Sequence, residues 1–279
     1  MKFTKMQGLG NDYVYINCFE EKVENPQELA KKVSDRHFGI GSDGLVLIMP
    51  SDFADCRMRM FNADGSESEM CGNATRCIGK FVYDRGIIKK NEISLETLAG
   101  IKHIKIKSNS KNEAELLTVD MGEPVLKADD IPVISNENPV KGLKIKALDK
   151  EFDFTCVSMG NPHAVTFVDD VENFDVSKYG PVLEIDNHFP KKSNIEFIQV
   201  LDRNHLKMRV WERGTGETLA CGTGACATAV ASVINDVCNR EDIYIKLLGG
   251  ELIINWDSKD NHVYMTGPAE FSFDGVWNK

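Results

Sequence analysis

Residues 68–86 read SEMCGNATRCIGKFVYDRG, and residues 218–236 read TLACGTGACATAVASVIND. In each stretch a Cys-Gly pair precedes a long, largely apolar segment that contains no proline. This pattern predicts a helix that begins after each cysteine, over residues 72–85 and 222–237. Two such similar stretches indicate that the chain contains two copies of one unit.

An internal repeat with an offset of 150 residues (221 − 71) extends well beyond Cys71 and Cys221. The same offset aligns identical residues on both sides of the cysteines, namely Gly10, Asn11, Met58, Arg59, Glu67, Gly72 and Gly100 with Gly160, Asn161, Met208, Arg209, Glu217, Gly222 and Gly250. Further on the register slips slightly, where LLTVDMG corresponds to NHVYMTG. The repeat predicts two pseudo-symmetric domains, residues 1–122 and 123–267.

Short segments rich in β-branched or alternating apolar residues surround the predicted helix of the first unit. They predict strands at 12–17, 44–49, 55–61, 92–97, 101–107 and 113–121. A further helix is predicted at 26–36, opened by Pro26. Many short strands and one long apolar helix per unit predict an α+β fold, in which a curved, mostly antiparallel, barrel-like sheet wraps around a central helix.

The composition excludes several classes of function. The 279 residues carry a net charge of −10 and the pI is near 5.2, which is the wrong sign for a nucleic-acid-binding surface. The sequence shows no apolar signal segment and no uninterrupted run of about 18 apolar residues, so we expect a cytoplasmic protein without membrane contact. Gly39, Gly41 and Gly44 spell G-x-G-x-x-G, but a helix precedes them and a strand follows, so we expect no nucleotide.

The eight cysteines are expected to be mostly free thiols, because a chain without an export signal normally stays in a reducing compartment. No pair has C-x-x-C spacing and no H-E-x-x-H motif is present, so we predict no metal site. A cysteine considered alone is usually a buried structural residue. The repeat is what distinguishes Cys71 and Cys221 from the others.

Both cysteines are predicted at helix N-termini, where free amides and the helix dipole push a thiol toward the thiolate. The glycine after each cysteine allows close approach of a ligand, and the amides of Asn73 and Thr223 can bind a carboxylate. Inverting a stereocentre requires one group that removes a proton and another that delivers one to the opposite face. A repeated cysteine is expected to supply both groups, without a metal or cofactor.

The two units differ where a substrate has to be oriented. Asn62 corresponds to Glu212, and Ala63 corresponds to Arg213. Arg213 can bind a carboxylate through two hydrogen bonds, and Glu212 can bind an ammonium group or shift the titration of the thiols. A Glu-Arg pair at a strand end is usually a surface ion pair, so its functional interpretation depends on its place beside the cysteine repeat.

At these residues the sequence resembles the diaminopimelate epimerase family, enzymes of lysine and peptidoglycan precursor biosynthesis. The resemblance implies that the final strand, near 268–279, returns to the first domain and that the protein is a homodimer. It also implies interconversion of LL- and meso-2,6-diaminopimelate without pyridoxal phosphate. The matching stretches are KMQGLGNDYVYIN (5–17), FGIGSDGLVLI (38–48), RMFNADGSESEMCGNATRC (59–77), VSMGNPHAV (157–165), SNIEFIQV (193–200) and VWERGTGETLACGTGACA (210–227).

The resemblance also implies individual roles. Cys71 is the proton donor and Cys221 the acceptor in the LL-to-meso direction, and His163 with Glu212 modulates the pKa of the thiols. Some family members have Gln where this chain has Gly44, so a side-chain contact is absent there. The implied substrate-binding residues are Asn11, Asn62, Gly72, Asn73, Asn161, Asn194, Glu212, Arg213, Gly222 and Thr223.

Alternative functions remain open at this point. Proline racemases, hydroxyproline epimerases and an isomerase of phenazine synthesis are similar in their two-copy scaffold. The phenazine isomerase lacks the paired cysteines, and a proline-type substrate has no distal amino and carboxylate groups for Arg213 to bind. Cys221 with His163 also fits the nucleophile and base of an acyl-transfer enzyme, although this leaves Cys71 unexplained. A disulfide between Cys71 and Cys221 under oxidising conditions, as in a thiol sensor, is a further hypothesis.

Overall fold

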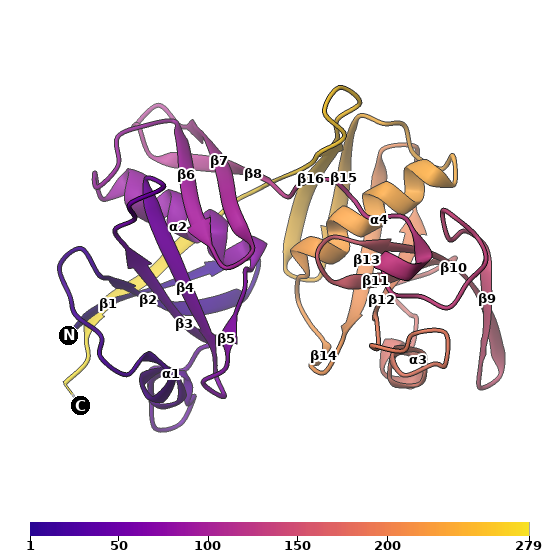
Figure 1. Ribbon diagram of the computed structural model, residues 1–279, viewed down its shortest axis with the longest axis horizontal. Helices are drawn as coiled ribbons and strands as arrows, with labels where there is room; N and C mark the ends of the chain where they lie inside the picture. The colour runs from indigo at the N-terminus through magenta and orange to yellow at the C-terminus, as the bar shows by residue number, and fades with distance from the viewer. Residues whose placement is uncertain (279) are drawn as a thin grey trace. The chain divides into compact units, whose positions relative to one another are not determined.

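The computed structural model describes residues 1–278. The chain forms two compact units: unit 1 comprises Met1–Asp120 with the C-terminal segment from Thr266, and unit 2 comprises Met121–Met265. Each unit combines a β-sheet with two α-helices (Figure 1). No helix in the described part of the chain has the length and apolar character needed to span a membrane.

The sheet of unit 1 is mostly antiparallel. Its elements are β1 (Lys2–Gly8), β2 (Asn11–Asn17), α1 (Pro26–Ser34), β3 (Gly44–Met49), β4 (Cys56–Asn62), β5 (Glu67–Ser68), α2 (Gly72–Asp84), β6 (Glu92–Thr97), β7 (Gly100–Ser108), β8 (Ala114–Asp120) and β18 (Glu270–Val276). β1 pairs with β2 and β18, β3 with β4, β4 with β5, and β7 with β6 and β8, all antiparallel. The pairs β2–β3 and β4–β6 are parallel.

Unit 2 repeats this pattern. Its elements are η1 (Ala128–Asp130), β9 (Leu143–Ala147), β10 (Lys150–Ser158), β11 (Pro162–Phe167), α3 (Val176–Glu184), β12 (Asn194–Val200), β13 (His205–Glu212), β14 (Gly216–Glu217), α4 (Gly222–Ile234), β15 (Asp242–Leu247), β16 (Gly250–Trp256) and β17 (Val263–Gly267), whose last residues belong to unit 1. β10 pairs with β9 and β11, β13 with β12 and β14, and β15 with β16, all antiparallel. The pairs β11–β12 and β13–β15 are parallel.

The order and direction of these pairings agree between the units, with β1 to β7 corresponding to β10 to β16. The register agrees as well, because Tyr13 lies opposite Gly44 in unit 1 and His163 lies opposite Asn194 in unit 2. The internal repeat predicted from the sequence is therefore confirmed in the topology.

The helix that follows each cysteine is buried against the sheet of its own unit. α2 contacts β1, β2, β7 and β8, and α4 contacts β10, β11, β12, β15 and β16. A Cβ atom on Gly79 of α2 would lie 2.8 Å from Leu117 Cδ2 of β8, so this helix approaches its sheet closely. α4 is apolar on most of its surface, as expected of a helix enclosed by other elements. These contacts confirm the predicted α+β fold with a sheet wrapped around a helix (Figure 1).

Several elements differ from the sequence-based expectation. The sequence does not predict β1, in which the polar residues Thr4 and Lys5 are buried, or α3, which contains a proline. The helix predicted at 222–237 ends at Ile234, because Asp236 adopts a left-handed φ of 58°. The helix predicted at 26–36 ends at Ser34, because Asp35 has extended backbone angles.

Candidate active site: two cysteine half-sites

The first half-site is built around Cys71, the N-cap residue of α2. Its backbone is extended, with φ −137° and ψ 123°, and its carbonyl accepts the first helical hydrogen bond from Thr75 N at 2.9 Å. The Cys71 Sγ donates a hydrogen bond to Asn11 Oδ1 at 3.4 Å. Asn11 begins β2 directly after Gly10, whose φ of 85° is strained for other residues. The structure thus brings the predicted residue Asn11 into contact with the predicted thiol.

Two further predicted residues of unit 1, Asn73 and Asn62, each have a hydrogen-bond partner within the unit. Asn73, in the first turn of α2, accepts a hydrogen bond from the buried Arg76 guanidinium at 2.9 Å. Asn62 ends β4 opposite Gly44 and donates to Ser66 Oγ at 3.0 Å. Gly72 is the first residue of α2. The sequence predicted Asn73, Asn62 and Gly72 as site residues, but not Arg76 or Ser66.

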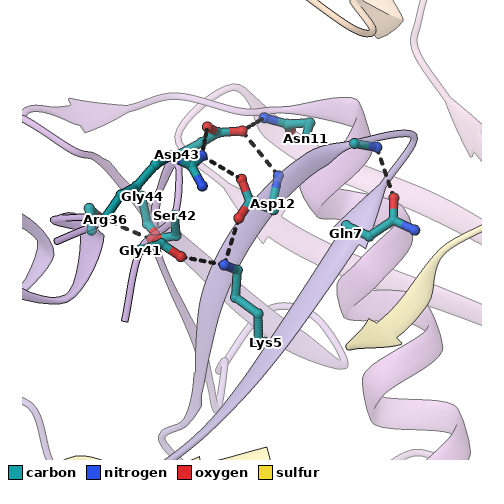
Figure 2. A network of polar contacts seen from close by, with 11 residues as sticks. Lys5, Gln7, Asn11, Asp12, Arg36, Gly41, Ser42, Asp43 and Gly44 are labelled. Carbon is teal, nitrogen blue, oxygen red and sulfur yellow. Dashed lines mark hydrogen bonds and ion pairs between the residues drawn. The ribbon is translucent and has the colours of Figure 1, made fainter. Parts of the chain in front are cut away.

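The amide nitrogen of Asn11 belongs to a polar network that includes Asp43, Asp12, Arg36 and Lys5 (Figure 2). Asn11 Nδ2 donates to Asp43 Oδ2 at 2.8 Å, and the Asp12 amide donates to the same oxygen at 3.0 Å. Arg36 bridges the two carboxylates, at 2.9 Å from Asp43 Oδ1 and 2.9 Å from Asp12 Oδ1. Lys5 Nζ lies 2.6 Å from Asp12 Oδ2.

The pKa values of the two carboxyl groups of this network shift in opposite directions. Burial raises the pKa of Asp43, and the neighbouring charge of Asp12 adds to this effect. Burial also acts to raise the pKa of Asp12, but hydrogen bonds from Arg36 and Lys5 outweigh it and lower that pKa. Both shifts reflect a cluster of charges that the fold keeps partly away from water.

The second half-site is built around Cys221, the N-cap residue of α4. Its Sγ accepts a hydrogen bond from the Gly224 amide at 3.4 Å, and Thr223 Oγ1 lies 3.5 Å from it. Only 5% of Cys221 is exposed. Burial raises the pKa of the Cys221 thiol well above its usual range, and the charges of Glu212 and Glu196 raise it further. The expectation that a helix start pushes this thiol toward the thiolate is wrong for Cys221 in the structure, because burial and the charges of Glu212 and Glu196 outweigh the amide and raise the pKa.

A buried histidine-carboxylate pair lies beside Cys221. His163 Nδ1 is 2.6 Å from Glu196 Oε1, and His163 Nε2 is 3.0 Å from Asn161 Oδ1. Because the Asn161 oxygen only accepts hydrogen bonds, His163 Nε2 is the donor in that contact. Burial raises the pKa of Glu196, while His163 opposes the shift. A Cβ on Gly224 would lie 2.8 Å from Glu196 Oε1, which places this pair against the first turn of α4.

Three of the remaining predicted residues of unit 2, Asn194, Glu212 and Arg213, lie at the adjoining ends of β12 and β13. Asn194 Nδ2 donates to Pro162 O at 2.7 Å, and its Oδ1 accepts from the Arg213 amide at 2.9 Å. The Arg213 guanidinium is exposed and donates to Lys191 O at 3.0 Å. Glu212 accepts a hydrogen bond from Thr218, and burial raises its pKa. Gly222 is the first residue of α4.

Sequence reasoning missed Asp43, Arg36 and Glu196. The signal for Glu196 is a single charged residue in the apolar strand NIEFIQV, at the position where unit 1 has Val46. The signal for Asp43 is weaker, because an aspartate before a strand is an ordinary turn residue. All eight cysteines are free thiols, and no group of three or more metal-ligating side chains occurs within residues 1–278.

Comparisons with known proteins match the chain over most of its length. A family model described as Diaminopimelate epimerase matches residues 3–127 and 155–272. A protein named diaminopimelate epimerase from Methanococcus maripaludis is 60% identical over 275 residues, which cover 99% of each chain. Another protein of that name, from Acetivibrio thermocellus, is 62% identical over 275 residues, covering 99% of this chain and 98% of the relative.

Solved structures of lower identity agree in fold. A predicted epimerase from Pseudomonas aeruginosa has a TM-score of 0.72 at 13% identity, covering 100% of this chain and 99% of its own. A phenazine biosynthesis protein from Bacillus anthracis has a TM-score of 0.70 at 19% identity, covering 99% and 98%. These similarities show the fold alone. The family model and the relatives with 60% identity or more show that the chain belongs to the diaminopimelate epimerase family.

Proposed function

We propose that this protein interconverts LL- and meso-2,6-diaminopimelate, with Cys71 and Cys221 as the acid and base and without a cofactor. The observation that carries the proposal is the duplicated cysteine: in both units the sulfur belongs to the N-cap residue of the central helix. A duplicated structural cysteine would not need this placement. Membership of the diaminopimelate epimerase family supports the choice of substrate.

The proposed chemistry is a proton exchange at one α-carbon. In the LL-to-meso direction Cys221, as thiolate, removes the α-proton and becomes a thiol, while the Cys71 thiol delivers its proton to the opposite face and becomes a thiolate. The reverse reaction exchanges these roles. The free amides at the starts of α2 and α4 favour the negative charge that spreads onto the substrate carboxylate when the proton leaves.

The raised pKa of Cys221 is consistent with a role that depends on bound substrate. A substrate ammonium group next to Glu212 would neutralise one of the carboxylates that disfavour the thiolate. We propose that Glu212 modulates the pKa of the Cys221 thiol in this way, and that His163 modulates it through its contact with Glu196.

Residues that differ between the units are proposed to orient the distal end of the substrate. Arg213 presents a guanidinium at an exposed strand end, where it can exchange Lys191 O for a carboxylate. Asn62 lies at the end of β4, and Asn194 lies at the start of β12, the strand that corresponds to β3. Asn11, Gly72, Asn73, Asn161, Gly222 and Thr223 complete the proposed substrate-binding set.

The test is incubation of the reduced protein with LL-diaminopimelate in deuterated water, followed by chiral separation and mass spectrometry. We expect meso product that carries α-deuterium. Cys71→Ala and Cys221→Ala should each reduce inversion by at least about 10²- to 10⁴-fold, the usual contribution of an acid or base. Inversion of proline instead of diaminopimelate would favour a proline-type racemase, and acyl transfer retained in Cys71→Ala would favour a hydrolase.

We also propose a cytoplasmic homodimer, on the basis of the family resemblance and the free cysteines. Light scattering after gel filtration should give twice the chain mass of 31.2 kDa. A mass that stays at one chain across concentrations would reject the dimer.

A further inference from the structure

The carboxamide of Asn11 has two chemically different ends, and the fold decides which end faces Cys71. Asn11 Nδ2 donates to Asp43 Oδ2 at 2.8 Å, and Asn11 Oδ1 accepts from Cys71 Sγ at 3.4 Å. A rotated amide would present its NH₂ group to the sulfur and its oxygen to Asp43. The two orientations have opposite effects on the thiol, because a carbonyl oxygen stabilises S–H whereas an N–H stabilises a thiolate.

An aspartate at position 43 selects between these orientations, since an ionised carboxylate accepts hydrogen bonds but cannot donate them. Asp43 is itself fixed by three donors: the Asn11 amide group, the Asp12 backbone amide at 3.0 Å and Arg36 at 2.9 Å (Figure 2). Rotation of Asn11 would place two oxygens against each other. We propose that Asp43 is a positioning residue that locks the Asn11 carboxamide with its oxygen toward Cys71 and so holds Cys71 in the protonated, proton-donating form.

The corresponding place in unit 2 is built differently. The residue equivalent to Asp43 is Ser193, whose hydroxyl donates to Asn194 O at 3.0 Å instead of holding an asparagine side chain. Asn161, the equivalent of Asn11, directs its oxygen to His163 Nε2 at 3.0 Å, and the Cys221 sulfur accepts from the Gly224 amide instead. The carboxylate clamp therefore distinguishes the first cysteine from the second.

Titratable side chains of two elements of unit 1 interact with Cys71. They include Tyr15 of β2 and Cys77 of α2. Burial raises the pKa of Cys77 to about 11 and that of Tyr15 well above its usual range, so both stay neutral near neutral pH. The charged groups behind Asn11 are Asp43, Asp12, Arg36 and Lys5.

The experiment is alkylation of the full-length, reduced protein by iodoacetamide across pH, with mass spectrometry resolving the Cys71 and Cys221 peptides. Asp43→Asn offers an NH₂ group to the Asn11 oxygen and allows the amide to rotate. We expect the alkylation midpoint of Cys71 to fall by about 0.7 pH unit, or about five-fold faster reaction at neutral pH, the effect of one hydrogen bond. The plateau rate at high pH and the profile of Cys221 should not change.

Asp43→Ser copies the residue of unit 2 and keeps the test decisive if Asp43→Asn folds poorly, with a shift in the same direction. Asp55→Asn is the matched control, because Asp55, like Asp43, accepts hydrogen bonds from a basic side chain and a backbone amide of unit 1, but it does not contact Asn11. It should leave the Cys71 midpoint unchanged. An alkylation midpoint of Cys71 that stays unchanged in both Asp43 variants would overturn the proposal. A higher plateau rate of Cys71 alkylation without a shift of the midpoint would also overturn it, because it would indicate only a loosened loop.

The inference rests on the proposed function only for its meaning in catalysis. With LL-diaminopimelate, Asp43→Asn should lower kcat by less than about two-fold at neutral pH, because Cys71 stays mostly a thiol, and the loss should grow as the pH approaches the lowered Cys71 midpoint. Wild-type protein without epimerase activity would reject the proposed function, while the alkylation profile would still decide the orientation of Asn11.

Discussion

The two units share a scaffold and differ in the residues that hydrogen-bond to the asparagine near each cysteine. In unit 1 Asn11 donates to Asp43, which forms a partly exposed ion pair with Arg36 in a loop region. In unit 2 Asn161 contacts His163, which is fully buried with Glu196. The duplicated backbone fixes the sulfur at a helix start, and the divergent residues set the proton affinity around it.

This difference follows from two positions on paired strands. His163 and Glu196 occupy adjacent parallel strands, β11 and β12, where unit 1 has Tyr13 and Val46 on β2 and β3. Unit 1 keeps these positions apolar or aromatic, and its carboxylates Asp12 and Asp43 lie near the start of β2 and just before the start of β3. The buried ionisable pair lies next to Cys221 and has no equivalent next to Cys71. The two half-sites should therefore respond differently to pH and to substrate charge.

The largest expected effect comes from separating the buried pair. Glu196→Val copies unit 1 and leaves His163 buried without its carboxylate, which should lower the free energy of unfolding by about 3–5 kcal/mol. Urea denaturation followed by circular dichroism measures this loss.

The double variant Glu196→Val/His163→Tyr transplants both unit 1 residues and should recover at least half of that loss, because removing a whole buried pair costs far less than breaking it. Equal stability of the single and double variants would show that the pair is not coupled.

Gly44 is expected to have the next largest effect. A Cβ at this position would lie 2.1 Å from Phe61 O and 2.8 Å from Tyr13 Cε1, so Gly44→Ala forces the β2, β3 and β4 backbones apart. We expect a loss of about 1–3 kcal/mol, typical of overpacking, measured by the same denaturation. The equivalent residue in unit 2, Asn194, accommodates a side chain that bonds Pro162 O.

Asn194→Ala serves as the comparison for Gly44→Ala, because it removes hydrogen bonds without overcrowding. Its loss should come to about 1–2 kcal/mol, the cost of leaving buried partners unsatisfied. If a Gly44→Gln variant were as stable as the wild type, the strands of unit 1 would be able to adapt to a side chain. Packing would then not explain why this chain lacks Gln at position 44.

The parts of the site encoded locally were predictable from the sequence. Cys71 and Cys221 appear in repeated motifs, and the glycine and apolar residues after them mark the start of a helix. Asp43 and Glu196 were not predictable, because their importance arises only when β3 pairs with β2 and β12 pairs with β11. The direction of the Cys221 pKa was mispredicted for the same reason, since burial and neighbouring carboxylates are tertiary effects.

Glu212 is expected to produce a moderate, pH-dependent effect. Burial raises its pKa above the usual 4.5, so between these values the folded state binds more protons than the unfolded state, and stability falls as pH rises. Glu212→Gln removes this dependence. Its melting temperature should exceed that of the wild type at pH 7.5 by about 2–4 °C, for roughly 1 kcal/mol, and by less at pH 5.

Calorimetry at the two pH values measures the Glu212 effect, and Glu217→Gln is its control. Glu217 pairs with Arg209 at 2.6 Å in unit 2, as Glu67 pairs with Arg59 in unit 1. Losing that ion pair should not stabilise the protein at pH 7.5. A Glu212→Gln variant that is less stable at pH 7.5 than at pH 5, relative to the wild type, contradicts the direction of the shift.

Thr223 should have the smallest effect and decides which donor matters most for Cys221. Its hydroxyl lies 3.5 Å from the sulfur, a long contact, whereas the Gly224 amide is fixed by the helix at 3.4 Å. Thr223→Val keeps the shape and removes the hydroxyl, so the Cys221 alkylation midpoint should rise by less than about 0.5 pH unit and kcat should change less than about three-fold. A rise of a full pH unit in the Cys221 midpoint would mean that the Thr223 hydroxyl stabilises the thiolate more than the helix start does. Unit 1 has Asn73 at this position, whereas the helix start is common to both units.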